Sequence, residues 1–185
     1  MTQFDVSGRN AMLEGFGTNL GPNAVLQIRS GPPPADCAAA DSGTLLASYT
    51  NVNWSAAASG SKALSGTPIT GTASAAGLAG HFRFKNTAGS ITRAQGLISQ
   101  PWAASTAFLL NQQVHNGGNV YRCTTAGTSA SSGGPTGTGA GISDGGAGGA
   151  VWAYLGVQAM TLDNTNLTNG QTVNVNSFSL TQSGA

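Results

Sequence analysis

Charge is scarce in this chain of 185 residues. Only 7% of the residues are charged, and seven Lys and Arg against six Asp and Glu give a formal net charge of +1. This balance provides no basic surface for nucleic acid or for an anionic membrane. Intrinsic disorder is also excluded, because disorder pairs low hydrophobicity with high net charge, whereas 39% of these residues are hydrophobic. A surface with so few charges is poorly soluble alone, so the composition favours a protein that assembles.

Long apolar runs and cysteines are scarce as well. No run approaches the roughly 20 apolar residues that span a bilayer. Residues 1–5 lack the basic and apolar regions of a signal peptide. We therefore expect a protein made in the cytoplasm, with no membrane partner. In that compartment the two cysteines, Cys37 and Cys123, are expected as free thiols in preference to a disulfide.

Groups that perform catalysis are equally few. The chain has one glutamate, Glu14, and two histidines, His81 and His115. A solvated His81 is favoured over a catalytic one, because no nucleophile elbow, zinc-ligand spacing or carboxylate pair accompanies it. The glycine-rich loop 127–150 lacks the Gly-Lys-Ser/Thr ending of a phosphate-binding loop. The sequence therefore predicts no enzyme, no metal site and no cofactor.

Residues 4–16 have the pattern of a helix. The residues expected on its apolar face are Phe4, Ala11, Met12 and Phe16. Ser7 is predicted to cap its start, and Gly15 and Gly17 are predicted stops. We expect this helix to dock on a β core. The alternative is an arm that packs on a neighbouring subunit.

Short alternating segments separated by Gly and Pro turns make up most of the remaining chain. The expected strands are 25–29, 44–52, 62–64, 69–75, 80–85, 90–98, 160–162 and 171–181, with a polar loop at 163–170. In strand 80–85, Phe82 and Phe84 should face the core. The residues expected to face solvent there are His81, Arg83 and Lys85. Near Asn176 the inward set of the last strand changes phase, which predicts a β-bulge. About eight or nine short strands predict a mainly β fold: a β-sandwich or jelly-roll-like domain with one N-terminal helix.

Residues 99–158 differ from the sequence on both sides. They contain an aromatic segment, the long Gly/Ser/Thr loop and a closing Trp152-Ala153-Tyr154. With this stretch removed, 91–98 would run into 160–162 as one β segment. We therefore expect a small β module inserted into an outer domain formed by residues 1–98 and 159–185.

The motifs of this module occur in a characteristic order. They are Trp102, Phe108, Val114, Asn116-Gly117-Gly118, Val120-Tyr121, Gly127, Pro135, Asp144-Gly145 and Trp152-Ala153-Tyr154. This order resembles small carbohydrate-binding modules of the chitin-binding (type 5/12) kind, which are three-stranded miniature sheets. The resemblance implies Trp102, Tyr121, Trp152 and Tyr154 as candidate carbohydrate-binding residues, because aromatic rings stack on the apolar faces of sugars. The same aromatics are the only available core of so short a module, so both interpretations stand.

The outer domain carries a second set of short motifs. They are Arg9-Asn10-Ala11-Met12-Leu13, Leu26-Gln27-Ile28-Arg29-Ser30-Gly31, Gly43-Thr44-Leu45-Leu46-Ala47, Gly80-His81-Phe82-Arg83-Phe84, Met160-Thr161-Leu162-Asp163-Asn164 and Gly170-Gln171-Thr172-Val173. Their order resembles a family of small tailed-bacteriophage virion proteins. The resemblance implies a decoration or cement protein on the capsid surface of the virion. Its partners would be the major capsid protein and copies of itself, with a trimer favoured among homo-oligomers.

Two further interpretations remain open beside decoration. Candidate capsid or subunit contacts are Arg9, Met12, His81, Arg83 and Lys85, although ordinary solvent exposure accounts for each equally well. A tail- or fibre-associated protein that binds host-surface glycans is the main alternative. A glycan-active enzyme is disfavoured, because the chain lacks the required carboxylate pair.

Overall fold

The computed structural model describes residues 3–145 and 149–182 of a mainly β chain. The helix is α1 (Val6–Leu20). The strands that precede the module are β1 (Ala24–Ser30), β2 (Leu45–Val52), β3 (Ser61–Ala63), β4 (Ile69–Thr72), β5 (Gly77–Lys85) and β6 (Thr92–Pro101). The module contributes β7 (Ala107–Phe108), β8 (Gln113–Asn116), β9 (Asn119–Thr125), β10 (Gly127–Thr128), β11 (Ile142–Ser143) and β12 (Val151–Val157). The strands that follow are β13 (Met160–Leu162), β14 (Asn166–Leu167) and β15 (Thr172–Thr181). The predicted fold class, mainly β with one N-terminal helix and β-sandwich-like, is confirmed.

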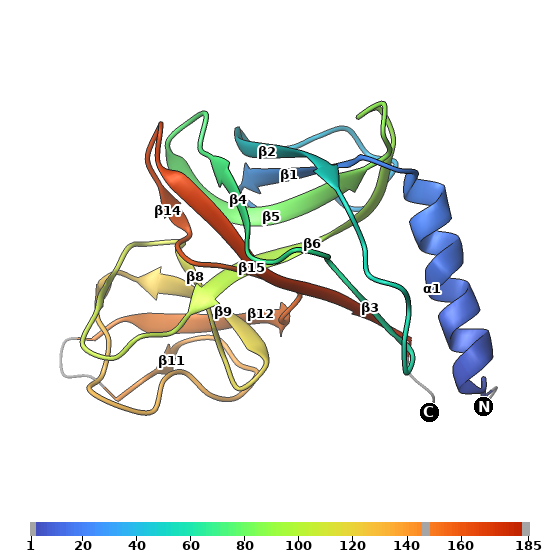
Figure 1. The fold of residues 1–185 in the computed structure, drawn as a ribbon. Coiled ribbons are helices and arrows are strands. Elements are labelled where there is room, and N and C mark those ends of the chain that lie inside the picture. Colours follow the sequence, from blue (N-terminus) through green and yellow to red (C-terminus); the bar gives the residue numbers. More distant parts are fainter. Residues whose placement is uncertain (1–2, 146–148, 183–185) are drawn as a thin grey trace.

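Helix α1 lies along one side of the outer domain (Figure 1) and differs in detail from the prediction. Asp5, not Ser7, is its N-cap, and the Asp5 carboxylate accepts a hydrogen bond of 2.7 Å from the Gly8 amide. The helix continues through both predicted stops to Leu20. Its buried face is Leu13 and Leu20, with Phe16 packed against the core between them. The predicted face is wrong for Phe4, Ala11 and Met12, which are exposed, because the helix turns its 13–16–20 stripe inward.

The two glycines inside α1 predict a contrast between variants. A Cβ on Gly15 would meet no atom within 4 Å, whereas a Cβ on Gly17 would lie 2.9 Å from Cε of Lys62. Gly15→Ala should raise the free energy of unfolding by about 0.5–1 kcal/mol, because alanine is the better helix former. Gly17→Ala gains the same propensity but displaces a lysine that is buried and bonded to Glu14. Urea denaturation should rank Gly15→Ala above Gly17→Ala, and the reverse order would contradict this packing.

The outer domain is a sheet that closes on itself. Its strand order is β2-β1-β5-β6-β13-β15-β4. A bridge between Ala47 and Ala73 joins the two ends, and the Ser74 amide donates to the carbonyl of Leu46 at 2.8 Å. The two layers of the predicted sandwich are therefore connected at both sides, and we call this closed sheet the barrel.

Aromatic side chains fill the barrel. Phe178 of β15 packs with its ring centroid 5.0 Å from those of Phe82 and Phe84 on β5, as the predicted alternation requires. Trp54 adds to the cluster, 5.0 Å from Phe84. Tyr49 crosses the interior and donates a hydrogen bond of 2.9 Å to the carbonyl of Val173. These edge-on and tilted aromatic contacts add to the free energy of burial and tie β5 to β15, and the Tyr49 hydrogen bond ties β2 to β15.

The last three strands show one confirmed and two incorrect predictions. The bulge is confirmed, because Thr161 pairs with Ser177 and Leu162 with Val175, which leaves Asn176 as the extra residue. The predicted polar loop 163–170 contains β14, which pairs with β5. Strand β13 does not extend β6 but lies beside it, parallel, with Met160 opposite Ile98. Parallel neighbours need a crossover connection, and the module is that connection.

The module has its own sheet and its own core. The sheet runs β11-β12-β9-β8, and it continues into the barrel because β8 also pairs in parallel with β6. The β8–β9 hairpin turns at Gly117 and Gly118, both at positive φ, as its Asn-Gly-Gly-Asn sequence favours. The buried residues of the module form a cluster separate from that of the barrel: Phe108, Val114, Tyr121, Cys123, Ala150 and Trp152.

Candidate functional site

Two of the four aromatic candidates for carbohydrate binding lie in the module core. Tyr121 and Trp152 are 1% and 0% exposed, so neither can stack on a sugar in this structure. Both side chains also have internal partners: the Tyr121 hydroxyl donates to the carbonyl of Gly137, and the indole of Trp152 packs edge-on against Phe108. Their assignment as binding residues is therefore wrong, and the reason is the shortage of other core residues in so small a module.

The other two candidates, Trp102 and Tyr154, are partly buried against the same cluster. The carboxylate of Asp144 accepts from the indole nitrogens of both Trp102 and Trp152, at 3.3 and 3.2 Å. This shared acceptor fixes the edge of the Trp102 ring. The remainder of the Trp102 ring is partly exposed to solvent, and it forms an aromatic surface of the module beside Asp144.

The three predicted outward residues of β5 are buried. His81, Arg83 and Lys85 do face away from Phe82 and Phe84, so the alternation is correct, but they are 0%, 1% and 7% exposed. The segment 31–43 covers them, and their assignment as solvent-facing capsid contacts is corrected accordingly. A period of two predicts the face of a strand but not whether another part of the chain covers that face.

Asp41 is the centre of this covered face. Its carboxylate lies 2.9 Å from Nη1 of Arg83, 2.8 Å from Nζ of Lys85 and 3.4 Å from Nη1 of Arg29. The carbonyl oxygens of Cys37 and Ala39 accept from Arg83, each at 2.9 Å. Burial acts to raise the pKa of Asp41. The hydrogen bond from Lys85 and the charges of Arg29 and Arg83 outweigh it, so the pKa lies below its usual range.

Asp41 belongs to no recognisable motif, although the sequence contains a signal for it. Three cations, Arg29, Arg83 and Lys85, fall on one face of two paired strands, and so many charges are rarely buried without a counter-ion. The short loop that follows the proline run holds the acids Asp36 and Asp41 nearby. The Asp36 carboxylate caps its own turn by accepting from the amides of Ala38 and Ala39, so Asp41 is the available counter-ion.

Both histidines are at least partly buried, and each has a polar partner at Nδ1. Burial lowers the pKa of both His81 and His115. His81 Nδ1 is 2.9 Å from the carbonyl of Gly31, and His115 Nδ1 is 3.1 Å from the Ser99 hydroxyl. Across residues 3–145 and 149–182, no three His, Cys, Asp or Glu side chains are grouped so as to hold a metal ion.

The remaining predicted residues are placed as follows. Arg9 donates to the backbone carbonyl of Gln182, which ties α1 to the end of β15. Met12 is 42% exposed on the outer face of α1. Cys37 and Cys123 are free thiols, as expected, and the latter is buried. In the described part of the chain no helix has the length and apolar character needed to cross a membrane.

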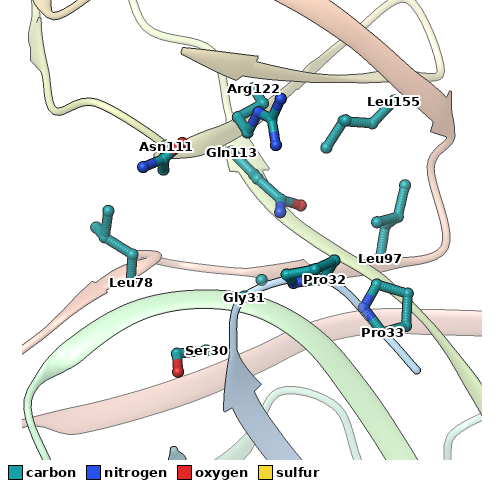
Figure 2. A pocket seen from close by; sticks show the side chains of 11 residues that line it. Ser30, Gly31, Pro32, Pro33, Leu78, Leu97, Asn111, Gln113, Arg122 and Leu155 are labelled. Carbon is teal, nitrogen blue, oxygen red and sulfur yellow. The ribbon is translucent and has the colours of Figure 1, made fainter. Parts of the chain in front are cut away.

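A cleft of about 700 Å³ separates the barrel from the module (Figure 2). The barrel side is the segment 31–33 with parts of β5 and β6, and the module side comes from β8, β9 and β12. The residues that define it are Pro32, Pro33, Leu97, Gln113, Arg122 and Leu155. No sequence pattern pointed to this cleft, because its walls come from six segments that only the fold brings together. It is larger than the other hollows described, and it falls in the size range of small-molecule sites.

The chain matches no protein-family model, no curated protein and no solved structure.

Proposed function

We propose that this protein is a non-enzymatic virion component of a tailed bacteriophage, a decoration or cement protein on the capsid surface. The barrel binds the major capsid protein and further copies of itself, in a trimer, and the module is displayed outward. The resemblance of the outer-domain motifs to small virion proteins is the starting point. The structural observation that carries the proposal is where the charges lie.

Many charged side chains of the barrel are paired with one another on its outer face, beneath segment 31–43 or helix α1. Arg29, Arg83 and Lys85 surround Asp41, and Lys62, with its side chain 5% exposed, is bonded to Glu14. The outer surface therefore keeps few charges, which suits a surface that other subunits cover.

Exposed apolar side chains accompany this low charge. Phe4, Val6 and Met12 are 44%, 47% and 42% exposed, and all three belong to α1 or its start. Large apolar groups gathered on one exposed element are typical of interaction surfaces. The candidate contact surface is therefore α1, which carries two of the predicted contact residues: Met12, which is exposed, and Arg9, which is partly buried.

Cementing follows from area and symmetry. Each interface across a seam between capsomers buries surface that must be exposed again before the shell opens. A symmetric oligomer repeats the contact, and the linked contacts act together. Cementing of this kind needs no chemical step.

Immunogold labelling of intact phage particles tests the proposal, with an antibody raised against residues 99–158 and mass spectrometry of the same particles. Gold spread over the heads is the expected result. Gold confined to the tail would contradict decoration and favour the second candidate below. Absence of the protein from purified particles would contradict any virion role.

The second candidate is a tail- or fibre-associated protein that binds host-surface glycans. What favours it is the partly open aromatic surface of Trp102 and Tyr154 at the edge of the module core. Titration of the full chain with chitin oligosaccharides tests this role, and Trp102→Ala is the informative variant because Trp152 is a core residue. Unchanged affinity in Trp102→Ala would exclude this ring as the binding platform.

A further inference from the structure

The cleft between barrel and module is held open by the chain on both sides. On the barrel side, Gly31 passes directly over Gly80, where a Cβ would lie 2.2 Å from the Gly31 carbonyl oxygen. Gln95 Nε2 donates to the carbonyl of Pro34 at 2.7 Å and holds the proline segment against β6. The barrel side of the cleft, which includes Pro32 and Pro33, is therefore held in place by these contacts.

The module side is fixed as well. Gln113 of β8 reaches the barrel: in the orientation that its neighbours require, its amide nitrogen donates to the carbonyls of Ile98 (2.7 Å) and Gly80 (3.2 Å). Arg122 lies on β9, where it is paired with Gln113 of β8 on one side and with Ala153 of β12 on the other. These three residues therefore share the face opposite the module core. Leu155, two residues after Ala153, lies on that same face and lines the cleft.

The lining of the cleft is largely apolar. Figure 2 shows Leu97, Leu155 and Pro33 on one side, Leu78 and Asn111 on the opposite side, and Arg122 between Asn111 and Leu155. Arg122 is the one charged residue among those that line the cleft, and none of them is acidic. Arg122 is exposed, and within the described residues its guanidinium makes no hydrogen bond or ion pair. An apolar cleft with an unpaired guanidinium on its wall is complementary to a molecule with an apolar body and one negative group.

We propose that this cleft binds a small amphipathic monocarboxylate, with its apolar chain between Leu97, Leu155 and the prolines and its carboxylate on Arg122. Each buried methylene adds hydrophobic free energy of binding, and a guanidinium binds a carboxylate through two charge-assisted hydrogen bonds. This site is independent of the virion role, because it lies away from α1 and uses none of the module aromatics.

Calorimetric titration of the full-length protein with sodium decanoate, below its micelle concentration, tests the site. We expect saturable binding of one decanoate per chain. Arg122→Gln should weaken it about tenfold, since a tenfold change corresponds to 1.4 kcal/mol. The matched control is Arg93→Gln, which removes the same charge from an exposed position on β6 outside the cleft and should leave the affinity unchanged. Decanol, which has the same chain and no charge, should bind the wild type and Arg122→Gln equally.

A second variant tests the apolar end. Leu155→Ala should weaken decanoate several-fold but leave the much weaker binding of acetate as it is, because acetate does not reach Leu155. Melting temperatures of the variants near that of the wild type show that they remain folded. Absence of saturable decanoate binding, equal affinity of Arg122→Gln and the wild type, or NMR shift changes that map outside the cleft would each overturn the proposal.

Discussion

Asp41→Asn should lower the free energy of unfolding by about 2–3 kcal/mol. The substitution leaves the shape of the side chain nearly unchanged but removes the one carboxylate that faces Arg29, Arg83 and Lys85. Removing one partner of a buried ion pair leaves a charge uncompensated, which costs about 3–5 kcal/mol in fully buried cases. We expect less here because the Asp41 side chain is 28% exposed. Equilibrium urea denaturation at pH 7 measures the difference.

Asp36→Asn is the matched control for Asp41→Asn. It makes the same change in the same loop, and the asparagine oxygen can still accept from the amides of Ala38 and Ala39. We expect it to stay within about 0.5 kcal/mol of the wild type. If both variants lost the same stability, the loop and not the ion cluster would be responsible.

The pH dependence of Asp41→Asn gives an independent check. The pKa of Asp41 is lowered in the folded protein, so the ionised carboxylate stabilises the fold fully above the ordinary carboxyl pKa of about 3.9. That contribution is lost as the pH falls through the lower pKa of the folded state. The stability difference between the wild type and Asp41→Asn should therefore be constant near neutrality and shrink below about pH 4.

Trp152→Ala should have the largest effect on the module. The side chain is fully buried, packs edge-on against Phe108 at a centroid distance of 5.1 Å, and donates to Asp144. Replacing a buried tryptophan by alanine costs about 3–5 kcal/mol, because the removed atoms leave a cavity. Amide hydrogen exchange along β9 and β12, compared with exchange in β1 and β5, measures the loss where it occurs.

Leu110→Ala is the control for Trp152→Ala, since Leu110 belongs to the module but is 52% exposed. Its exchange rates should match those of the wild type. Normal protection of β9 in Trp152→Ala would contradict the core assignment. Loss of sugar binding in Trp152→Ala would therefore report unfolding of the module, whereas the same loss in Trp102→Ala would report a contact.

Local sequence patterns predict which residues of a strand share a face, but they do not predict whether that face is exposed or covered. Phe82 and Phe84 point inward and Asn176 forms the bulge, because alternation depends only on the strand itself. His81 and its neighbours were assigned to solvent, since no local signal shows that segment 31–43 folds back over β5. Residue type alone does not distinguish Ser7 from Asp5 as the N-cap, because both are good caps, and in the structure it is the Asp5 carboxylate that accepts from the Gly8 amide.

For the candidate sites, too, the sequence identifies the residues but not whether they are buried. The module aromatics could be named from their order, but whether each one faces the core depends on packing: Trp152 is enclosed and Trp102 is not. The cleft could not be predicted at all. Leu97 and Leu155 are 58 positions apart and meet only because β8 pairs in parallel with β6 and brings the module sheet against the barrel.

The parallel pairing of β6 with β13 bears on how such a protein can change over evolution. The chain leaves the barrel at the end of β6 and returns at Met160, which pairs with Ile98 on that strand. Because the two strands are parallel, a replacement for the intervening segment has to be a crossover connection of about a dozen or more residues. One barrel can therefore exchange its module for another crossover segment by recombination at this seam, while the strands that enclose its core keep their places.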